Sequence, residues 1–299
     1  MGWTLFSVAS KVLYLAGIAA VFGGALAYLL LCRTSFGSTR SIVYYIASGA
    51  LLGLFGSASF FLAQVGSIND VGILGMLDSS MVRMLADSSL GSASMVRAMG
   101  LFLGLILVLI IVRDSKQQLR TAANLVVMAC LLALVGLFFA RSVTLTGHVS
   151  TLDLVARVVL GIHVATVLGW IGSLWPLWLI CRSENVSSLQ KIMTAYGQIA
   201  VYVVVGLTAS GLWLAWQLLN SFSDLFFTSY GRLLLLKLFG VSLLLLIAAR
   251  HKLKLVPRLA HDDGVNRLRQ SICMETAVAV LVLVVTATLT TAIGPESEH

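Results

Sequence analysis

Long apolar stretches alternate with short polar segments along most of this 299-residue chain. Each stretch is about 20 residues or more, which suffices for a helix rising about 1.5 Å per residue to cross a bilayer. Eight such stretches occur, at about residues 12–32, 42–65, 95–113, 122–140, 155–182, 196–218, 231–250 and 272–292. The pattern predicts an all-α fold, a polytopic membrane protein built as a bundle of eight transmembrane helices.

The fifth stretch, 155–182, has two different faces when it is drawn as a helix. At about 100° per residue, its small residues share one stripe and its polar and aromatic residues share the opposite side: Gly161, Ala165, Gly169 and Gly172 against His163, Thr166 and Trp170. Small residues let a neighbouring helix approach closely, and a polar face is a poor match for lipid. We therefore expect this helix at the centre of the bundle.

Composition and charge agree with a membrane protein. Hydrophobic residues make up 59% of the chain and charged residues 11%, far from the balance of a soluble domain. The net charge of +8 is explained by Lys and Arg in cytoplasmic loops, so membrane lipid and not nucleic acid is the expected partner. Counted over alternate loops, 13 Lys and Arg residues fall on one side and 7 on the other. The richer side is assigned to the cytoplasm, which places both termini outside.

Charged side chains inside a membrane span are costly, by about 2.5–3.5 kcal/mol at its centre on the insertion scale. Each one therefore needs a physical reason. Lys237 lies in the outer part of the seventh stretch and Glu275 at the cytoplasmic start of the eighth, too far apart in depth to pair directly. The basic segment 251–271, which includes His251 and His261, is expected to be a solvated topology anchor.

Histidine is the most informative residue type in or near the spans. His163 lies within the fifth stretch and His148 lies just before it, so a folded-back loop can bring both imidazoles to one point. The neutral ring binds Cu, Zn or Fe through one nitrogen while a polar neighbour holds the other, a role open to Asp153 or Thr166. A lone histidine in a span is more often a hydrogen-bonded packing residue, and that alternative stays open.

Methionines gather on the same outer side as these histidines. Five of nine lie in the 66–94 loop or at the adjoining end of the third stretch: Met76, Met81, Met84, Met95 and Met99. Thioether sulfur is a soft donor that suits Cu(I). Methionines at helical spacing are usually core filler, but next to imidazole they favour copper. We expect Met95 and Met99 as ligands and the three loop methionines as the capture site.

Several motifs of enzymes and pumps are absent from the sequence. It holds no G-x-x-x-x-G-K-[ST] loop for nucleotide, no Cys-Pro-Cys or Asp-Lys-Thr-Gly motif of a copper P-type ATPase, and no H-E-x-x-H zinc signature. No Ser/His/Asp set is apparent from the spacing either. The sequence therefore does not argue for an enzyme.

Four groups of residues together resemble the copper resistance protein D family (CopD/PcoD), over about residues 141–295. They are Thr146-Gly147-His148 with His163 and Trp170-Ile171-Gly172; Tyr230-Gly231-Arg232 with Lys237; Arg267-Leu268-Arg269-Gln270-Ser271-Ile272 with Glu275; and Gly294-Pro295. Residues 141–299 would form the CopD-like four-helix half. Residues 1–140, which agree with the family only in hydropathy, would form an N-terminal four-helix half with the outward methionine loop.

The resemblance implies an eight-helix protein of the bacterial inner membrane that takes copper from the periplasm, often beside a periplasmic copper-binding protein of the copper resistance C type. It marks five positions: His148, His163, Arg232, Lys237 and Glu275. The chain departs from many members at Gly172-Ser173, where they have Gly-Gly, and at Leu160, where they have an acidic residue. The lost acid leaves the orientation of the His163 ring to another group, for which Asp153 is the candidate.

Three functions fit the sequence. In a copper-uptake permease, Cu(I) would pass from the methionines to His148 and His163 and then inward past Trp170, with Asp153, Thr166, Arg232, Lys237 and Glu275 in supporting roles. Its weak point is the inner half, where Tyr196, Gln198 and Cys181 are poor ligands. A haem b electron-transfer protein would use His148 and His163 as axial ligands. A non-transporting copper sensor or assembly subunit is the third alternative.

Overall fold

The structure, a computed structural model, describes residues 2–32, 39–117, 121–146, 153–218, 223–261 and 263–292. Within those ranges the chain is helical and contains no strand, and eight helices are long and apolar enough to cross a membrane. They are α1 (Gly2–Ala27), α2 (Thr39–Asn69), α4 (Ser89–Gln117), α5 (Ala122–Thr144), α6 (Leu154–Ser183), α7 (Val186–Leu218), α9 (Ser229–Arg250) and α10 (Gly264–Leu289). The predicted all-α fold with eight spans is therefore confirmed.

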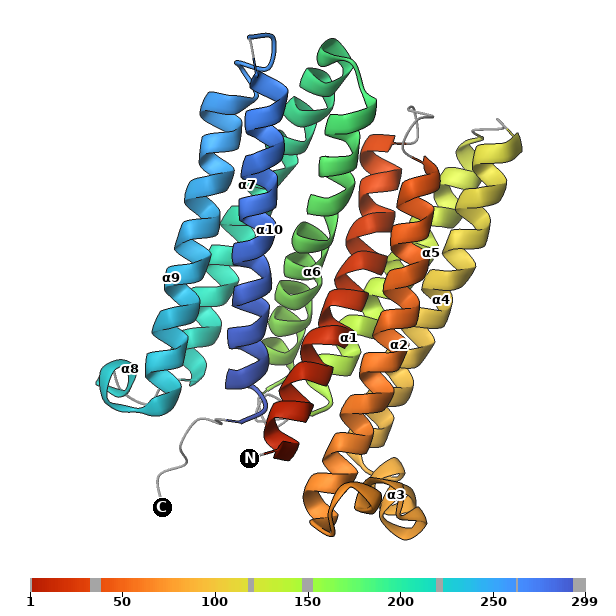
Figure 1. The fold of residues 1–299 in the computed structure, drawn as a ribbon, viewed down its shortest axis with the longest axis vertical. Coiled ribbons are helices and arrows are strands. Elements are labelled where there is room, and N and C mark those ends of the chain that lie inside the picture. The colour runs from red at the N-terminus through yellow and green to blue at the C-terminus, as the bar shows by residue number, and fades with distance from the viewer. Residues whose placement is uncertain are drawn as a thin grey trace.

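The spans form one bundle, with α2, α4 and α5 on one side of α1 and with α6, α7, α9 and α10 on the other (Figure 1). The start of α1 and the end of α10 lie at the same end of the bundle. There the Lys11 ammonium donates a hydrogen bond to the Thr290 carbonyl at 3.2 Å. Both helices therefore place the two ends of the described chain on one side of the membrane, and the assignment of that side to the periplasm stays a prediction.

Small residues set the contacts of α1. Gly17 lies against the backbone of Gly49 and Gly53 in α2, and Gly172 of α6 lies against the backbone of Ala19 and Gly23. A Cβ atom on Gly172 would overlap the Ala19 carbonyl, so only glycine allows this approach. The predicted stripe of small residues is thus a helix-packing surface.

The centre of the bundle is α1 and not the 155–182 helix, which corrects the prediction from the sequence. In its most apolar stretch α1 has 67% of its residues buried, against 22% in α6. The reason is that α1 is covered by small-residue contacts on two sides, whereas the polar side of α6 faces cavities and α7.

Two segments outside the spans differ from simple loops. The 66–94 segment holds a 3-10 helix, η2 (Ile73–Leu77), and a short α-helix, α3 (Ser79–Ala86). Asp78 caps α3, and hydrogen bonds from the Ser80 hydroxyl and the Met81 N–H hold the pKa of this carboxyl below its usual value. A further short helix, α8 (Asp224–Phe227), precedes α9, and a π-helical turn, η1 (Tyr28–Cys32), extends α1.

The basic segment 251–271 is mostly helical, and Lys252, Lys254, Arg258 and Arg267 in it are exposed, so its role as a topology anchor stays a prediction. A π-helical turn, η4 (His251–Leu255), continues α9, and α10 already begins at Gly264. The connection between them is short and lies at the end of the bundle opposite the start of α1 (Figure 1). His251 therefore belongs to the helical bundle.

Candidate functional site

His163 projects from α6 toward α7, where its Nδ1 atom lies 2.8 Å from the Ser210 hydroxyl. Ser210 has one proton, and its hydroxyl oxygen lies 2.6 Å from the Gly206 carbonyl, to which it donates. The serine must then accept the Nδ1–H of His163, so the network assigns the lone pair to Nε2. This is the tautomer in which Nε2 can bind a metal while Nδ1 is held in place.

A glycine and a lysine from neighbouring helices lie near the His163 ring. A Cβ atom on Gly211 of α7 would lie 3.2 Å from His163 Cε1, so glycine leaves room for the ring. The charge of Lys237, from α9, acts on the imidazole. His148, the predicted partner of His163, lies outside the described residues.

The two residues expected to orient His163 have other partners. The Asp153 carboxylate caps α6 by accepting the Ala156 N–H at 2.8 Å. The Thr166 hydroxyl donates to the Ile162 carbonyl of its own helix at 2.7 Å. Ser210 takes the expected role instead, and the 47 residues between it and His163 explain why sequence spacing gave no sign of it.

The predicted methionine ligands are not brought to His163. Met95 and Met99 lie on α4 with 63% and 46% of their surface exposed, and α4 packs with α1, α2 and α5 on the other side of the bundle from α7 and α9 (Figure 1). Arg97, between them, points inward, donates to the Ser57 hydroxyl at 3.0 Å and stacks on a buried tyrosine ring. The other three predicted methionines lie at the end of the bundle, in η2 and α3: Met76, Met81 and Met84.

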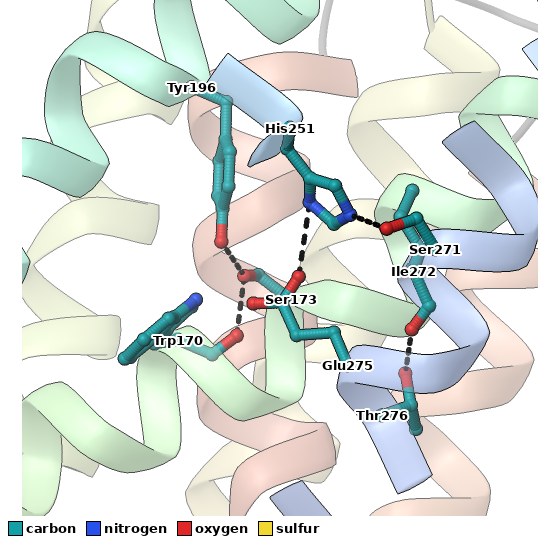
Figure 2. A network of polar contacts seen from close by, with 8 residues as sticks. All are labelled: Trp170, Ser173, Tyr196, His251, Ser271, Ile272, Glu275 and Thr276. Carbon is teal, nitrogen blue, oxygen red and sulfur yellow. Dashed lines mark hydrogen bonds and ion pairs between the residues drawn. The ribbon is translucent and has the colours of Figure 1, made fainter. Parts of the chain in front are cut away.

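A second histidine, which sequence reasoning set aside, lies in a polar network in the opposite half of the bundle. His251 Nδ1 is 3.2 Å from a carboxylate oxygen of Glu275, and Nε2 is 2.7 Å from the Ser271 hydroxyl. Figure 2 shows the ring between these two side chains. Only 3% of the Glu275 side chain is exposed, so His251 and not water is the polar partner of this carboxyl group. The four-residue spacing of Ser271 and Glu275 on α10 was the available signal.

Hydroxyl groups continue the polar network toward the middle of the bundle. Ser173 donates to the Trp170 carbonyl at 2.7 Å, and its oxygen lies 3.0 Å from the Tyr196 hydroxyl. Because the serine proton is used on the carbonyl, Tyr196 is the donor to Ser173. The Tyr196 hydroxyl is also close enough to Glu275 to interact with it electrostatically, and it points toward Ser173 and Glu275 (Figure 2).

Two cavities meet at this network. One, of about 350 Å³, is lined among others by Trp170, Tyr196, His251, Lys252 and Glu275. The other, of about 490 Å³ and largely apolar, is lined among others by Phe22, Thr166, Trp170, Ser173 and Tyr196. Trp170, Tyr196 and Ala200 line both cavities and therefore form the wall that the two share.

The order Ser271–His251–Glu275 is that of a hydrolase triad, but Ser271 is not placed to act as a nucleophile. It is 4% exposed, sits in the second turn of α10, and is not among the described residues that line the cavity. The backbone N–H groups around it are bonded within the helix and cannot form an oxyanion hole. The triplet therefore serves charge compensation inside the bundle.

Comparison with known proteins gives a family match over one segment of the chain. Residues 190–289 match the family model described as copper resistance protein D (CopD), which confirms the predicted resemblance over that segment. No curated protein and no solved structure matches the chain. The fold and this match together define a multi-pass membrane protein related to copper resistance. The matched segment contains Ser210, Lys237, His251 and Glu275, whereas His163 precedes it.

Arg232, in the first turn of α9, is exposed and lies 3.5 Å from the Ser229 hydroxyl. Within the described ranges, no group of three or more His, Cys, Asp or Glu side chains is arranged to hold a metal ion. A copper site that uses His163 would therefore need further ligands, from His148, from a sulfur donor or from the protein that delivers the metal.

Proposed function

We propose that the protein carries copper across the bacterial inner membrane and that His163 Nε2 is the Cu(I) ligand in the outer half of the bundle. The observation that carries the proposal is the His163–Ser210 hydrogen bond, which leaves Nε2 free in a chain with a CopD segment. A ring fixed through one nitrogen and open at the other is what a transient metal site needs.

The rest of the path is proposed from position. His148, which precedes His163 by 15 residues in the sequence, is the candidate second ligand. Met76, Met81 and Met84 at the end of the bundle are the proposed capture site. The exposed positions of Met95 and Met99 favour lipid contact over a ligand role. With both termini in the periplasm, these groups face a periplasmic copper-binding protein of the copper resistance C type, the proposed partner.

Transport is favoured over the alternatives by the two cavities that meet at Trp170 and Tyr196. The sensor and assembly alternatives do not account for two pockets that share Trp170 and Tyr196. Haem needs room beside its axial ligand, and His163 lines neither of these two cavities. The role is non-enzymatic, and the C-terminal half, residues 141–299, carries it while residues 1–140 provide the packed support.

The test is Cu(I) uptake by proteoliposomes that contain the purified protein, under anaerobic conditions with a chelator inside. Wild type should accumulate copper, His163→Ala should lose most of that uptake, and His261→Ala, a change in the exposed connection to α10, should keep it. Equal uptake by wild type and His163→Ala would remove His163 from the path. Uptake no faster than in empty vesicles would end the transport proposal, and an intense red colour lost in His163→Ala would replace copper by haem.

A further inference from the structure

The His251–Glu275 pair combines a buried carboxylate with a titratable counter-charge. The pair lies 3.2 Å apart inside the bundle, at the level of η4 and the start of α10, and it lines the 350 Å³ cavity. Ionisable groups in this position are costly and mark ion or proton pathways in membrane proteins. A fixed cation such as arginine would have neutralised Glu275 permanently, whereas histidine can gain and lose its charge.

The hydrogen bonds of His251 can persist in both charge states. Nδ1–H donates to Glu275 whether the ring is neutral or protonated. The Ser271 hydroxyl, 2.7 Å from Nε2, can donate to the neutral ring and accept from the protonated one, because a hydroxyl rotates between the two roles. Uptake of one proton therefore changes the charge of the site without breaking a bond.

The hydroxyl groups of Tyr196 and Ser173 lie close to this pair (Figure 2). Tyr196 lines both cavities, feels the Glu275 charge and donates to Ser173, which lines the 490 Å³ cavity. The carboxylate thus lies at one end of a Tyr196–Ser173 bridge across the wall between the cavities (Figure 2).

Other titratable or charged groups lie on the elements around the His251–Glu275 pair. They include Tyr196 on α7, Lys252 on η4, Cys181 on α6 and Arg269 on α10. The same elements also carry four exposed groups, Arg250, Lys254, Arg267 and Cys273. The Lys252 stem lies against Gly197, and the Arg269 guanidinium stacks on the Trp178 ring at 5.3 Å. Neither cation forms an ion pair with Glu275 within the part of the chain that the structure describes.

We propose that the His251–Glu275 pair is a proton-binding site, that Tyr196 and Ser173 pass its proton between the two cavities, and that copper transport is coupled to this proton. Water in one cavity supplies the proton: an O–H bond of hydronium breaks and an N–H or carboxyl O–H bond forms on the pair. Water on the other side takes the proton up again, so charge and atoms balance. The coupling to copper rests on the proposed transport function.

The experiment records copper uptake and internal pH together, in proteoliposomes loaded with a pH-sensitive dye. Wild type should move protons in proportion to copper. Glu275→Gln, which keeps volume and hydrogen bonding, should lower the ratio of protons to copper at least tenfold, and Tyr196→Phe should lower it severalfold. Matched controls are Thr276→Val, whose hydroxyl bonds the Ile272 carbonyl of its own helix at 2.9 Å, and Tyr202→Phe, a tyrosine of α7 that is 80% exposed. Both controls should keep the wild-type ratio.

The outcomes separate this inference from the transport proposal. Copper uptake by wild type without proton movement overturns the coupling and leaves transport standing. An unchanged ratio in Glu275→Gln removes the pair from the proton path. Infrared difference spectra between acidic and neutral pH give a readout that needs no transport: a carboxyl, carboxylate or imidazole band that changes in wild type and not in folded Glu275→Gln supports the proton site, and identical spectra overturn it. The unfolding temperature of each variant shows whether it is folded.

Discussion

His163 and His251 are both bonded to a serine, yet their charged neighbours are opposite. The charge near His163 is the Lys237 ammonium, and the charge next to His251 is the Glu275 carboxylate. His163 uses Nδ1 on Ser210 and leaves Nε2 open, whereas His251 uses both ring nitrogens, on Glu275 and Ser271. The His251 site lies at the level of Ser173 on α6, which is ten residues or about 15 Å along the helix from His163.

This difference assigns two kinds of chemistry to the same residue type. A ring with an open nitrogen can donate a lone pair to a soft metal, and a nearby cation keeps that metal loosely held. A ring that shares its hydrogen bond with a buried carboxylate has no lone pair to offer without breaking that bond, but it can hold a proton. Under the two proposals, metal contact therefore belongs to one end of the bundle and proton contact to the other.

The largest expected effect is on stability, at the second histidine. His251→Ala leaves the Glu275 carboxylate buried without its counter-charge, and removing one partner of a buried pair costs about 3–5 kcal/mol. We expect a loss of this size in the free energy of unfolding, measured by denaturant titration in bicelles. His163→Ala, which leaves a serine and no buried anion, should cost about 1 kcal/mol. Equal losses in the two variants would contradict the difference between the sites.

The next effect is on copper affinity and compares the two serines. Ser210→Ala frees His163 to rotate and to change tautomer, and loss of a group that orients a metal ligand typically weakens binding about 10–100-fold. Ser271→Ala removes the same hydroxyl from His251 and should leave copper affinity unchanged. Anaerobic competition with a Cu(I) chelator measures both. An equal loss in the two serine variants would place copper at both histidines.

The difference in charge between the two sites predicts a smaller effect, which is an increase in copper affinity. Even well-solvated like charges 4 Å apart repel by about 1 kcal/mol, so a neutral residue in place of Lys237 should tighten Cu(I) binding, by about fivefold. Lys237→Met tests this, with Lys252→Met at the other histidine as the control. Weaker binding by Lys237→Met at unchanged folded yield would mean that the ammonium holds a ligand in place and does not repel the metal.

The sequence predicted the spans and singled out His163 because both are marked locally. Apolar length marks a span wherever its partners lie, and His163 is conspicuous inside one. His251 was missed because the basic residues Arg250, Lys252 and Lys254 suggested a solvated loop, while η4 extends the helix past them. Its carboxylate partner is 24 residues away on another helix, and the Ser210 partner of His163 is 47 residues away. Only the tertiary structure brings residues so far apart in the sequence together.

Hydropathy also did not predict how deeply each helix is buried in the bundle. The most apolar stretches of α1 and α7 have similar mean hydropathy, 2.0 and 1.8, but 67% of residues are buried in the first and 6% in the second. The glycines of α1 lie against the backbones of α2 and α6, whereas a Cβ on Gly206 of α7 would meet nothing within 4 Å. Which small residues find a partner depends on the order of the helices in the bundle, and hydropathy does not contain that order.

The smallest expected effect concerns the methionines of α4, and it decides whether the metal site extends beyond the histidine. Met95 and Met99 are exposed to the surroundings of the bundle on the side away from α7 and α9 (Figure 1). Leucine nearly preserves their volume, and such swaps cost under about 1.5 kcal/mol even in a core. Met95→Leu and Met99→Leu should therefore leave Cu(I) affinity and stoichiometry within about twofold of wild type, well below the Ser210→Ala effect. A tenfold loss in either variant would show that these sulfurs bind the metal, and the copper path would then begin on α4 and run around α1 to reach His163.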